Sequence, residues 1–321
     1  QEVTLKFHHI WPAAAMAPTR VIAPWCDKVA AESNNRIKCQ MLHAMSGGGT
    51  PPQLVDRVKD GVDDLTITLP GYTAGRFPAM EVFELPFMTN SAEAGGSAAW
   101  EYLQKHGLKE FPGTKILATW VHDEGYVHTS SKQIKTLDDF KGLKMRAPTR
   151  QTNKLLAKLG ATPVGMPVTG VADALSKGTI DGFALPWEVI PAFKLHEMTK
   201  FHTQTDPTRP ALYSAGFIFA MNQAKYDKLS AEDKKAVDAI SGETAARIFG
   251  RGWDKVDRRA FGLMQANGVQ VTKADAKFVA DIKSKTAPLE QGWIKAAEAK
   301  GLKNPAKVLS DFRAEIAKLE K

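Results

Sequence analysis

The chain has 321 residues, a length that favours about two domains. Hydrophobic residues make up 43% and charged residues 24%, which is a globular rather than a disordered composition, and no apolar run is long enough to predict a membrane span. The net charge of +8 favours attraction of anions. Basic residues alternate with acidic ones and no RNP or zinc-finger motif appears, so nucleic acid is not an expected partner.

The first elements alternate between strand and helix patterns. The expected order is a strand at Val3–His9, a helix at Thr19–Ser33, a strand at Arg36–Leu42, a helix at Leu54–Lys59 and a strand at Leu65–Leu69. This order predicts a mostly parallel sheet with helices on both faces. Because the chain starts directly in a strand pattern, we expect a mature protein whose secretion signal has been removed.

A second segment repeats the pattern of the first. Leu54–Pro70 reads LVDRVKDGVDDLTITLP and Val171–Pro186 reads VADALSKGTIDGFALP. Each combines a helix, a glycine that fits a helix C-terminal cap, an aspartate three residues later and an apolar strand ending in Leu-Pro. The repeat predicts two similarly built α/β lobes, although a helix–Gly–strand order is common enough to arise by chance.

Two β-rich segments are candidates for connections between the lobes. Ile116–His128 is long enough to cross from the first lobe to the second, and Tyr213–Asn222 provides a return crossing. Two crossings create a hinge with a cleft beside it. A long helical pattern follows from Ser230 towards Gln265 and is expected to brace both lobes, with Gly242 among the glycines that permit a bend.

The chain has two cysteines, Cys26 and Cys39, and no CxxC motif, and two thiols by themselves cannot form a structural zinc site. They lie on a predicted helix and on the strand after it. A disulfide in an oxidising compartment and two buried free thiols are both compatible with this spacing.

Arg146 ends a short predicted strand, Leu143–Arg146, and the next helix starts between Thr149 and Asn153. In open α/β sheets, ligands bind at the carboxyl ends of strands. A guanidinium there suits a carboxylate, because its two parallel N–H groups match the two oxygens. The alternative is an arginine that pairs with a neighbouring acid or reaches solvent.

Several stretches together resemble the solute-binding subunits of tripartite ATP-independent periplasmic (TRAP) transporters, the DctP-like family. In that family the pattern is LKGLKxR, a helix, and then LGAxPxxMPxxEVYxALQxGxVDGxENP. The matching stretches here are GLKMRAPTR, LGATPVGMPV, SGGGTPPQLVDRVKDGVDDL, GRFPAMEVFELPFM and KYDKLSAEDKKAV. The resemblance covers nearly the whole chain, and it rests on the combination rather than on any single stretch.

The resemblance implies a two-lobed periplasmic binding protein fold of class α/β, with hinge-crossing strands and a long bracing helix. We divide it into a first lobe of residues 1–122 plus 214–250 and a second lobe of residues 123–213 plus 251–321, which includes the C-terminal helices. It also implies a periplasmic, monomeric receptor that has no cofactor and holds an organic acid at Arg146. Delivery to the membrane permease subunits of a TRAP transporter follows from the same resemblance.

Three positions depart from the family pattern. Val127 replaces a second arginine, Leu185 replaces the asparagine of DGxENP, and Val168 replaces an aromatic residue. A hydroxyl-rich ligand would lose hydrogen bonds worth roughly 1 kcal/mol each at such positions. We therefore expect a monocarboxylate with an apolar or aromatic body, such as a benzoate, and small aliphatic 2-oxo or 2-hydroxy acids as the alternative.

Further candidates for the cleft are aromatic or can form hydrogen bonds. These candidates are Trp11, Tyr72, Phe183, Trp187 and His9, and His9 could form a hydrogen bond with a hydroxyl or keto oxygen of the ligand. The alternative for each of them is ordinary packing in the core.

Catalytic and metal motifs are missing from the sequence. SGGGT at Ser46–Thr50 lacks the GK[ST] ending of a phosphate loop, and neither GxSxG nor HExxH occurs. His122–Glu124 reads HDE, but three consecutive side chains on a strand alternate in direction and cannot all reach one ion. We therefore expect a receptor without a metal site. An enzyme on the same scaffold and a receptor of the ABC type are the rivals.

Overall fold

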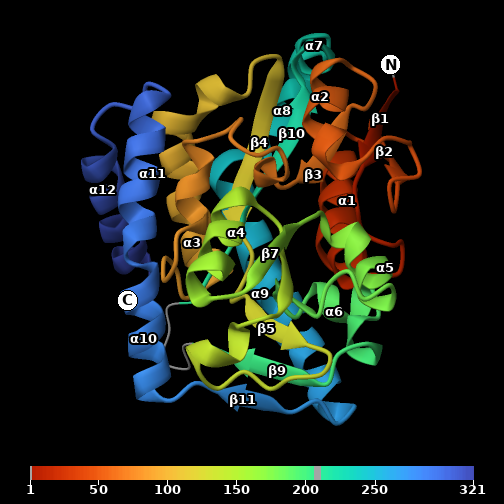
Figure 1. Cartoon of the computed structure of the whole chain (residues 1–321). Coiled ribbons are helices and arrows are strands. Elements are labelled where there is room, and N and C mark those ends of the chain that lie inside the picture. The colour runs from red at the N-terminus through yellow and green to blue at the C-terminus, as the bar shows by residue number, and fades with distance from the viewer. Residues whose placement is uncertain (1, 206–210) are drawn as a thin grey trace.

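The computed structural model describes residues 2–205 and 211–321, and it has two sheets in two lobes (Figure 1). The first sheet has the order β2-β1-β3-β10-β4, and the second has the order β11-β9-β5-β8-β6-β7. Helices pack against both, so the expected two-lobed α/β class is confirmed. No helix in these residues is apolar over a length sufficient to cross a membrane.

The first sheet consists of β1 (Val3–His8), β2 (Ile37–Leu42), β3 (Leu65–Thr68), β4 (Thr114–Val121) and β10 (Gly216–Asn222). The second consists of β5 (Tyr126–Thr129), β6 (Lys144–Ala147), β7 (Thr162–Gly165), β8 (Gly182–Leu185), β9 (Phe201–Gln204) and β11 (Val271–Lys273). The helices are α1 (Ala23–Glu32), α2 (Leu54–Lys59), α3 (Ala92–Tyr102), α4 (Arg150–Leu159), α5 (Val171–Ser176), α6 (Val189–Ala192), α7 (Gln223–Asp227), α8 (Ala231–Ala239), α9 (Gly242–Ala266), α10 (Ala276–Thr286), α11 (Pro288–Ala299) and α12 (Pro305–Leu319).

The repeat in the sequence is a repeat in the fold. The unit β1–α1–β2–α2–β3 of the first lobe matches β6–α4–β7–α5–β8 of the second, and in each the first strand lies parallel between the other two. Gly61 and Gly178 follow α2 and α5 with φ values of 75° and 67°, a left-handed conformation that glycine adopts without steric cost.

The two aspartates of the repeat make the same contacts in each lobe. Asp64 Oδ2 accepts the backbone N–H of Lys6 at 2.8 Å, and Asp181 Oδ2 accepts the backbone N–H of Lys144 at 2.8 Å. Each aspartate therefore fastens the start of the third strand of its unit to the first. The side chain does what a further ladder hydrogen bond would do.

Two strands cross between the lobes side by side. The chain leaves β4 of the first sheet, passes through residues 122–125 and enters β5 of the second, so the predicted long β segment is interrupted at the hinge. On the return, β10 follows β9 and pairs antiparallel with β4. The N–H of His122 donates to the Ala215 carbonyl at 3.2 Å, and the N–H of Gly125 donates to the Tyr213 carbonyl at 3.1 Å.

The long helical pattern forms two helices, because α8 ends before Ser241 and α9 begins at Gly242 with a φ of 69°. Helix α9 packs against α3 and β4 of the first lobe. Further along, its Phe261 ring lies 6.3 Å from that of Tyr126 and 5.1 Å from that of Trp187, both in the second lobe. The helix therefore braces both lobes, as expected.

The C-terminal helices also contact both lobes. Phe278 and Ile282 of α10 belong to the core of the second lobe. Trp293 of α11 and Phe312 of α12 belong to a core of the first lobe, where Trp293 Nε1 donates to the Pro78 carbonyl at 3.0 Å. The sequence-based division placed all of residues 251–321 with the second lobe, whereas α12 packs on α3.

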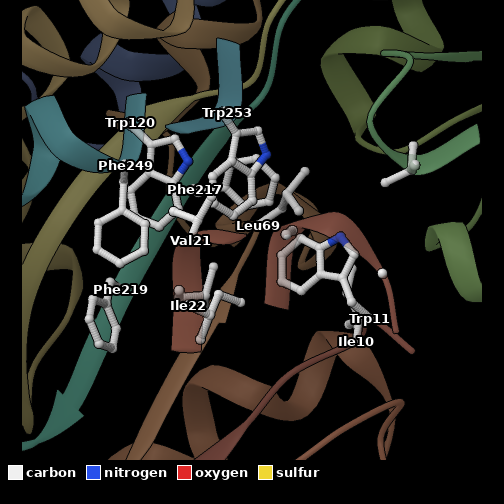
Figure 2. Close-up of a cluster of buried hydrophobic side chains, with 14 of the residues drawn as sticks. Ile10, Trp11, Val21, Ile22, Leu69, Trp120, Phe217, Phe219, Phe249 and Trp253 are labelled. Atoms are coloured by element: carbon white, nitrogen blue, oxygen red, sulfur yellow. The ribbon is translucent and has the colours of Figure 1, made fainter. Parts of the chain in front are cut away.

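An aromatic cluster fills the first lobe beside the hinge (Figure 2). The Trp120 ring lies 4.6 Å from Phe249 and 5.4 Å from Phe217, and Trp253 lies 5.7 Å from Trp11. Trp11 is at the side of the cluster in Figure 2, which brings its indole next to the space between the lobes.

Cys26 of α1 and Cys39 of β2 form a disulfide with a Cα–Cα distance of 5.9 Å, which resolves the two alternatives left by the sequence.

Candidate ligand-binding site

A pocket lies between the lobes, where strands of both sheets end. The first lobe and the hinge contribute the loops after β1 and β3, the end of β4, and β10, while the second lobe contributes the ends of β6 and β8 and the loop before α5. All of the lining side chains are buried except Tyr72, which is half-buried. The lining residues are Ile10, Trp11, Leu69, Tyr72, His122, Arg146, Pro148, Val168, Leu185, Pro186, Glu188, Val189, Tyr213 and Phe217.

Arg146 reaches the pocket from the third position of β6, and its side chain is fully buried. Its Nε donates to the carbonyl of Met166 at 2.9 Å and its Nη1 to the carbonyl of Ala184 at 3.3 Å. These two bonds fix the plane of the guanidinium. Its Nη2 has no hydrogen-bond partner in the described part of the chain.

The charge of Arg146 has no carboxylate beside it within residues 2–205 and 211–321. Burial lowers the pKa of Arg146, and the groups that oppose this effect are the hydroxyls of Tyr72 and Tyr213 rather than an acid. Arginine nevertheless stays protonated in proteins. An isolated buried cation is costly unless an anion neutralises it. The site is therefore electrostatically incomplete in a way that an anionic ligand would correct.

Other polar atoms of the lining also lack partners among the described residues. They are the Tyr213 hydroxyl, the Trp11 indole Nε1 and Glu188 Oε1. Buried polar groups are normally hydrogen-bonded, so a group of unsatisfied ones at a single pocket indicates a polar ligand or water. Tyr72 differs from them, because its hydroxyl accepts the Val168 N–H at 3.3 Å across the two lobes.

Glu188 precedes α6 and is held by its backbone. Its N–H donates to Asp257 Oδ1 of α9 at 2.8 Å. Burial raises the pKa of the Glu188 carboxyl to about 8, and the nearby Trp11 indole partly opposes the rise. The indole N–H of Trp11 and the carboxyl of Glu188 are neighbours, but their contact falls outside normal hydrogen-bond geometry.

The rest of the pocket wall is apolar. Both lobes contribute to it, so a ligand body would be held between two hydrophobic surfaces when the lobes are closed. The apolar lining residues are Ile10, Leu69, Pro148, Val168, Leu185, Pro186, Val189 and Phe217.

Five of the nine residues selected from the sequence line this pocket: Arg146, Tyr72, Trp11, Val168 and Leu185. The other four lie outside the lining. Val127 belongs to the core of the second lobe, and Phe183 stacks on His128 at 5.1 Å. Trp187 packs against the His128 ring at 4.9 Å, and the ring of His9 packs against His43 at 4.9 Å while its Nδ1 accepts the N–H of Trp11 at 3.1 Å.

Sequence reasoning missed the polar residues Tyr213, His122 and Glu188. His122 follows β4 and Tyr213 precedes β10, so both lie on the two crossings that the sequence analysis had already proposed, and that position is the signal that could have selected them. Glu188 follows Trp187 directly, and no sequence pattern indicates which side chain turns inward after Pro186.

Contacts across the lobes lie beside the pocket. Arg150 and Gln151, at the start of α4, bind Glu81 of the first lobe: Arg150 Nη2 lies 2.9 Å and Gln151 Nε2 2.8 Å from Glu81 Oε2. Next to them, Gly71 faces Thr149, and a Cβ on this glycine would come within 2.5 Å of Thr149 Cγ2. The lobes are therefore closed on one another here.

The described residues offer no cluster of three or more His, Cys, Asp or Glu side chains with a geometry that could hold a metal ion. The chemistry that the pocket can perform is recognition: a fixed cation, a few neutral hydrogen-bonding groups and apolar walls, enclosed between two lobes joined by a hinge. A two-lobed solute-binding receptor is the class of protein that this fold and this site define.

The comparison with known families gives the same class. Residues 7–296 match the family described as bacterial extracellular solute-binding protein, family 7, and the chain belongs to that family. The members that it resembles in sequence and structure are solute-binding proteins of transporters rather than enzymes.

Three solved structures are similar over nearly the whole chain. A TRAP solute-binding protein from Rhodoferax ferrireducens T118, in complex with copurified benzoate, is 46% identical with a TM-score of 0.96, over 99% of this chain and 98% of the other. A marine metagenome TRAP protein specific for aromatic acid ligands, with 3-hydroxybenzoate, is 45% identical with a TM-score of 0.96 over 100% of both chains. A TRAP protein from Bordetella bronchiseptica with bound mandelate is 29% identical with a TM-score of 0.91 over 99% of both.

Proposed function

We propose that this chain is a periplasmic receptor that captures an aromatic monocarboxylate in the pocket between its lobes and delivers it to a TRAP membrane permease. In this proposal Arg146 binds the carboxylate, and the apolar walls surround the ring. The observation that carries the proposal is the fully buried guanidinium, which has a free Nη2 and no acid beside it in the described part of the chain.

The composition of the pocket supports one carboxylate rather than two. Among the described residues, Arg146 is the only arginine or lysine in the lining. A second ligand carboxylate would therefore be buried without a cation, which is strongly unfavourable. The apolar walls disfavour a sugar acid, because each buried hydroxyl without a partner costs about 1–3 kcal/mol.

The relatives support an aromatic body. Benzoate, 3-hydroxybenzoate and mandelate, the ligands of the three similar structures, each carry one carboxylate on or next to a single ring. The identities of 46% and 45% over whole chains place the first two proteins closer to this one than the 21%-identical receptor with bound galactonate.

Capture would proceed by closure of the hinge. The lobes open about the paired crossings between β4–β5 and β9–β10, the acid enters, and closure brings Tyr72 and Val168 together over it. Exclusion of water then strengthens the attraction between Arg146 and the carboxylate, because the local dielectric constant falls. The closed receptor is the form that the permease would recognise. Location in the periplasm and an existence as a monomer belong to the same proposal.

A thermal-shift titration tests the proposal. The purified chain is mixed with benzoate, with pyruvate and lactate as small aliphatic acids, and with galactonate as a sugar acid. A bound ligand stabilises the folded state by about 2.7 kcal/mol at a hundred times its Kd, so benzoate should raise the melting temperature with dose. Calorimetry then gives the stoichiometry, which should be one.

A dose-dependent shift with the aliphatic acids and none with benzoate would reject the aromatic ligand and favour the 2-oxo or 2-hydroxy acids instead. Consumption of benzoate on long incubation would reject the receptor in favour of an enzyme.

A further inference from the structure

The carboxyl of Glu188 is not needed to neutralise a monoanion, because Arg146 supplies the positive charge in the proposed function. It lies in a pocket that we propose to bind a carboxylate, where an ionised second carboxyl group would repel the ligand. It is nevertheless 1% exposed, and its Oε1 has no partner among the described residues. Such a group needs a hydrogen-bonding partner when the pocket is filled.

Glu188 and Arg146 occupy separate parts of the pocket. Arg146 comes from β6, whereas Glu188 follows the end of β8 and Trp11 lies in the loop after β1, so these groups enter the pocket from different elements. A ligand whose carboxylate contacts Arg146 would present another part of its body to Glu188.

The Trp11 indole stands beside Glu188 and also lacks a partner within the described residues. Both groups are held from behind. The Trp11 ring packs on Trp253 at 5.7 Å, and the Glu188 backbone N–H is bonded to Asp257. The site thus contains a rigid N–H donor and a rigid carboxyl, both buried and both unsatisfied.

Resting on the function proposed above, we propose that Glu188, together with the Trp11 indole, is the specificity-determining group of the pocket and selects ring acids that carry a neutral hydroxyl distant from the carboxylate. The preferred ligand class is then hydroxylated benzoates rather than benzoate itself.

The protonation of Glu188 supports this selection. With a pKa raised to about 8 by burial, the carboxyl carries a proton at neutral pH. A neutral carboxyl has one O–H donor and one free acceptor oxygen, and a phenolic hydroxyl also donates one bond and accepts another. The two groups can therefore satisfy each other, while the indole N–H supplies a further donor.

The same geometry excludes other substituents. A second carboxylate would be buried in a pocket whose described lining offers no arginine or lysine besides Arg146. A fluorine or a hydrogen at the ring position would leave Glu188 and Trp11 unsatisfied. The pocket would therefore discriminate by penalising ligands that cannot complete its hydrogen bonds, which gives larger ratios than apolar contact does.

The test is calorimetry at pH 7 on the whole chain with five ligands: benzoate, 3-hydroxybenzoate, 4-hydroxybenzoate, 3-fluorobenzoate and isophthalate. At least one hydroxybenzoate should bind the unmodified protein at least about tenfold more tightly than benzoate. The fluoro analogue should resemble benzoate within about threefold, and isophthalate should not bind.

Two variants locate the effect at Glu188. Glu188→Leu should bind benzoate more tightly than the unmodified protein, because no carboxyl is left unsatisfied, and should lose the preference for hydroxyl, whereas Glu188→Gln should keep the preference because an amide also donates and accepts. Glu110→Leu is the matched control, since it removes a carboxyl with a pKa of about 7 that lies outside the pocket lining. It should change none of the ratios.

The outcomes are separable. Failure of the unmodified protein to bind any of the ring acids would refute the proposed function, and this proposal with it. Binding of benzoate with no preference for either hydroxybenzoate, or equal binding of 3-fluorobenzoate and 3-hydroxybenzoate, refutes the role of Glu188 alone. So does an unchanged preference in Glu188→Leu. The ligand comparisons use the unmodified protein, so they decide the question even if this variant does not fold.

Discussion

Replacing Arg146 with methionine should weaken ligand binding and stabilise the empty protein at the same time. Methionine has a similar length and no charge. In the complex, the change removes one partner of a buried, hydrogen-bonded charge pair, which costs about 2–5 kcal/mol. A loss of about 3 kcal/mol corresponds to a Kd raised on the order of a hundredfold.

In the empty protein the balance is reversed. The change removes the cost of burying an unpaired cation, which is several kcal/mol even after relaxation. Against this stand two hydrogen bonds, to the carbonyls of Met166 and Ala184, worth about 1 kcal/mol each. We therefore expect the free energy of unfolding of Arg146→Met, without ligand, to be about 1–2 kcal/mol higher than that of the unmodified chain.

The assay is chemical unfolding with and without benzoate, together with calorimetry of benzoate binding. Arg146→Lys is a control that keeps the charge but loses the planar fork, so it should weaken binding and give no gain in stability. The reasoning is refuted if Arg146→Met destabilises the empty protein by more than about 1 kcal/mol while Kd changes less than threefold. That result would make Arg146 a structural residue.

Three further predictions concern the surroundings of the site. Burial, and then the neighbouring Glu81, raise the pKa of Glu84 to about 8, so the folded protein is favoured when this carboxyl is protonated. The stabilisation is complete below pH 4.5, and the free energy of unfolding falls as the pH rises towards 8. In unfolding measured against pH, Glu84→Gln should reduce this fall by a few kcal/mol. Glu81→Ala removes the carboxylate that holds Arg150 across the lobes. Small-angle scattering should therefore show a more open empty protein, and calorimetry should show a Kd for benzoate raised about threefold to tenfold. An unchanged scattering profile and an unchanged Kd would contradict a role of this contact in closure. Reduction of the Cys26–Cys39 bond, which closes a short loop, should lower the unfolding free energy by about 2–3 kcal/mol and leave the Kd for benzoate unchanged; a change in Kd would show that the bond positions the site.

The sequence predicted the framework of the fold because repeated backbone requirements leave local traces. Gly61 and Gly178 mark left-handed helix ends, and Asp64 and Asp181 follow at the same distance, where each fastens two strands together. These features depend on neighbouring residues or on a single strand pair. They can therefore be recognised without knowing how the lobes face each other.

The candidate site was only partly predictable, for a different physical reason. Arg146 was selected because a cation at the end of an apolar strand contradicts its surroundings. Tyr213 and Glu188 reach the pocket from a hinge crossing and from a turn after Pro186, where the side-chain direction depends on the tertiary path. Val127 was selected by alignment to a family position, but on β5 it points into the core of the second lobe.

The crossing strands tie the completion of each lobe to a distant part of the chain. The first sheet has β10, residues 216–222, inserted between β3 and β4, so its core cannot close until the chain has been synthesised well beyond the second lobe's parallel unit. A nascent chain that must wait for so late a strand folds slowly, because non-local pairing needs long loops to close first. Slow maturation of this kind would suit the periplasmic location proposed above, because an exported chain crosses the membrane before it folds. A fragment ending at residue 125 should accordingly remain unfolded, as judged by its amide proton spectrum.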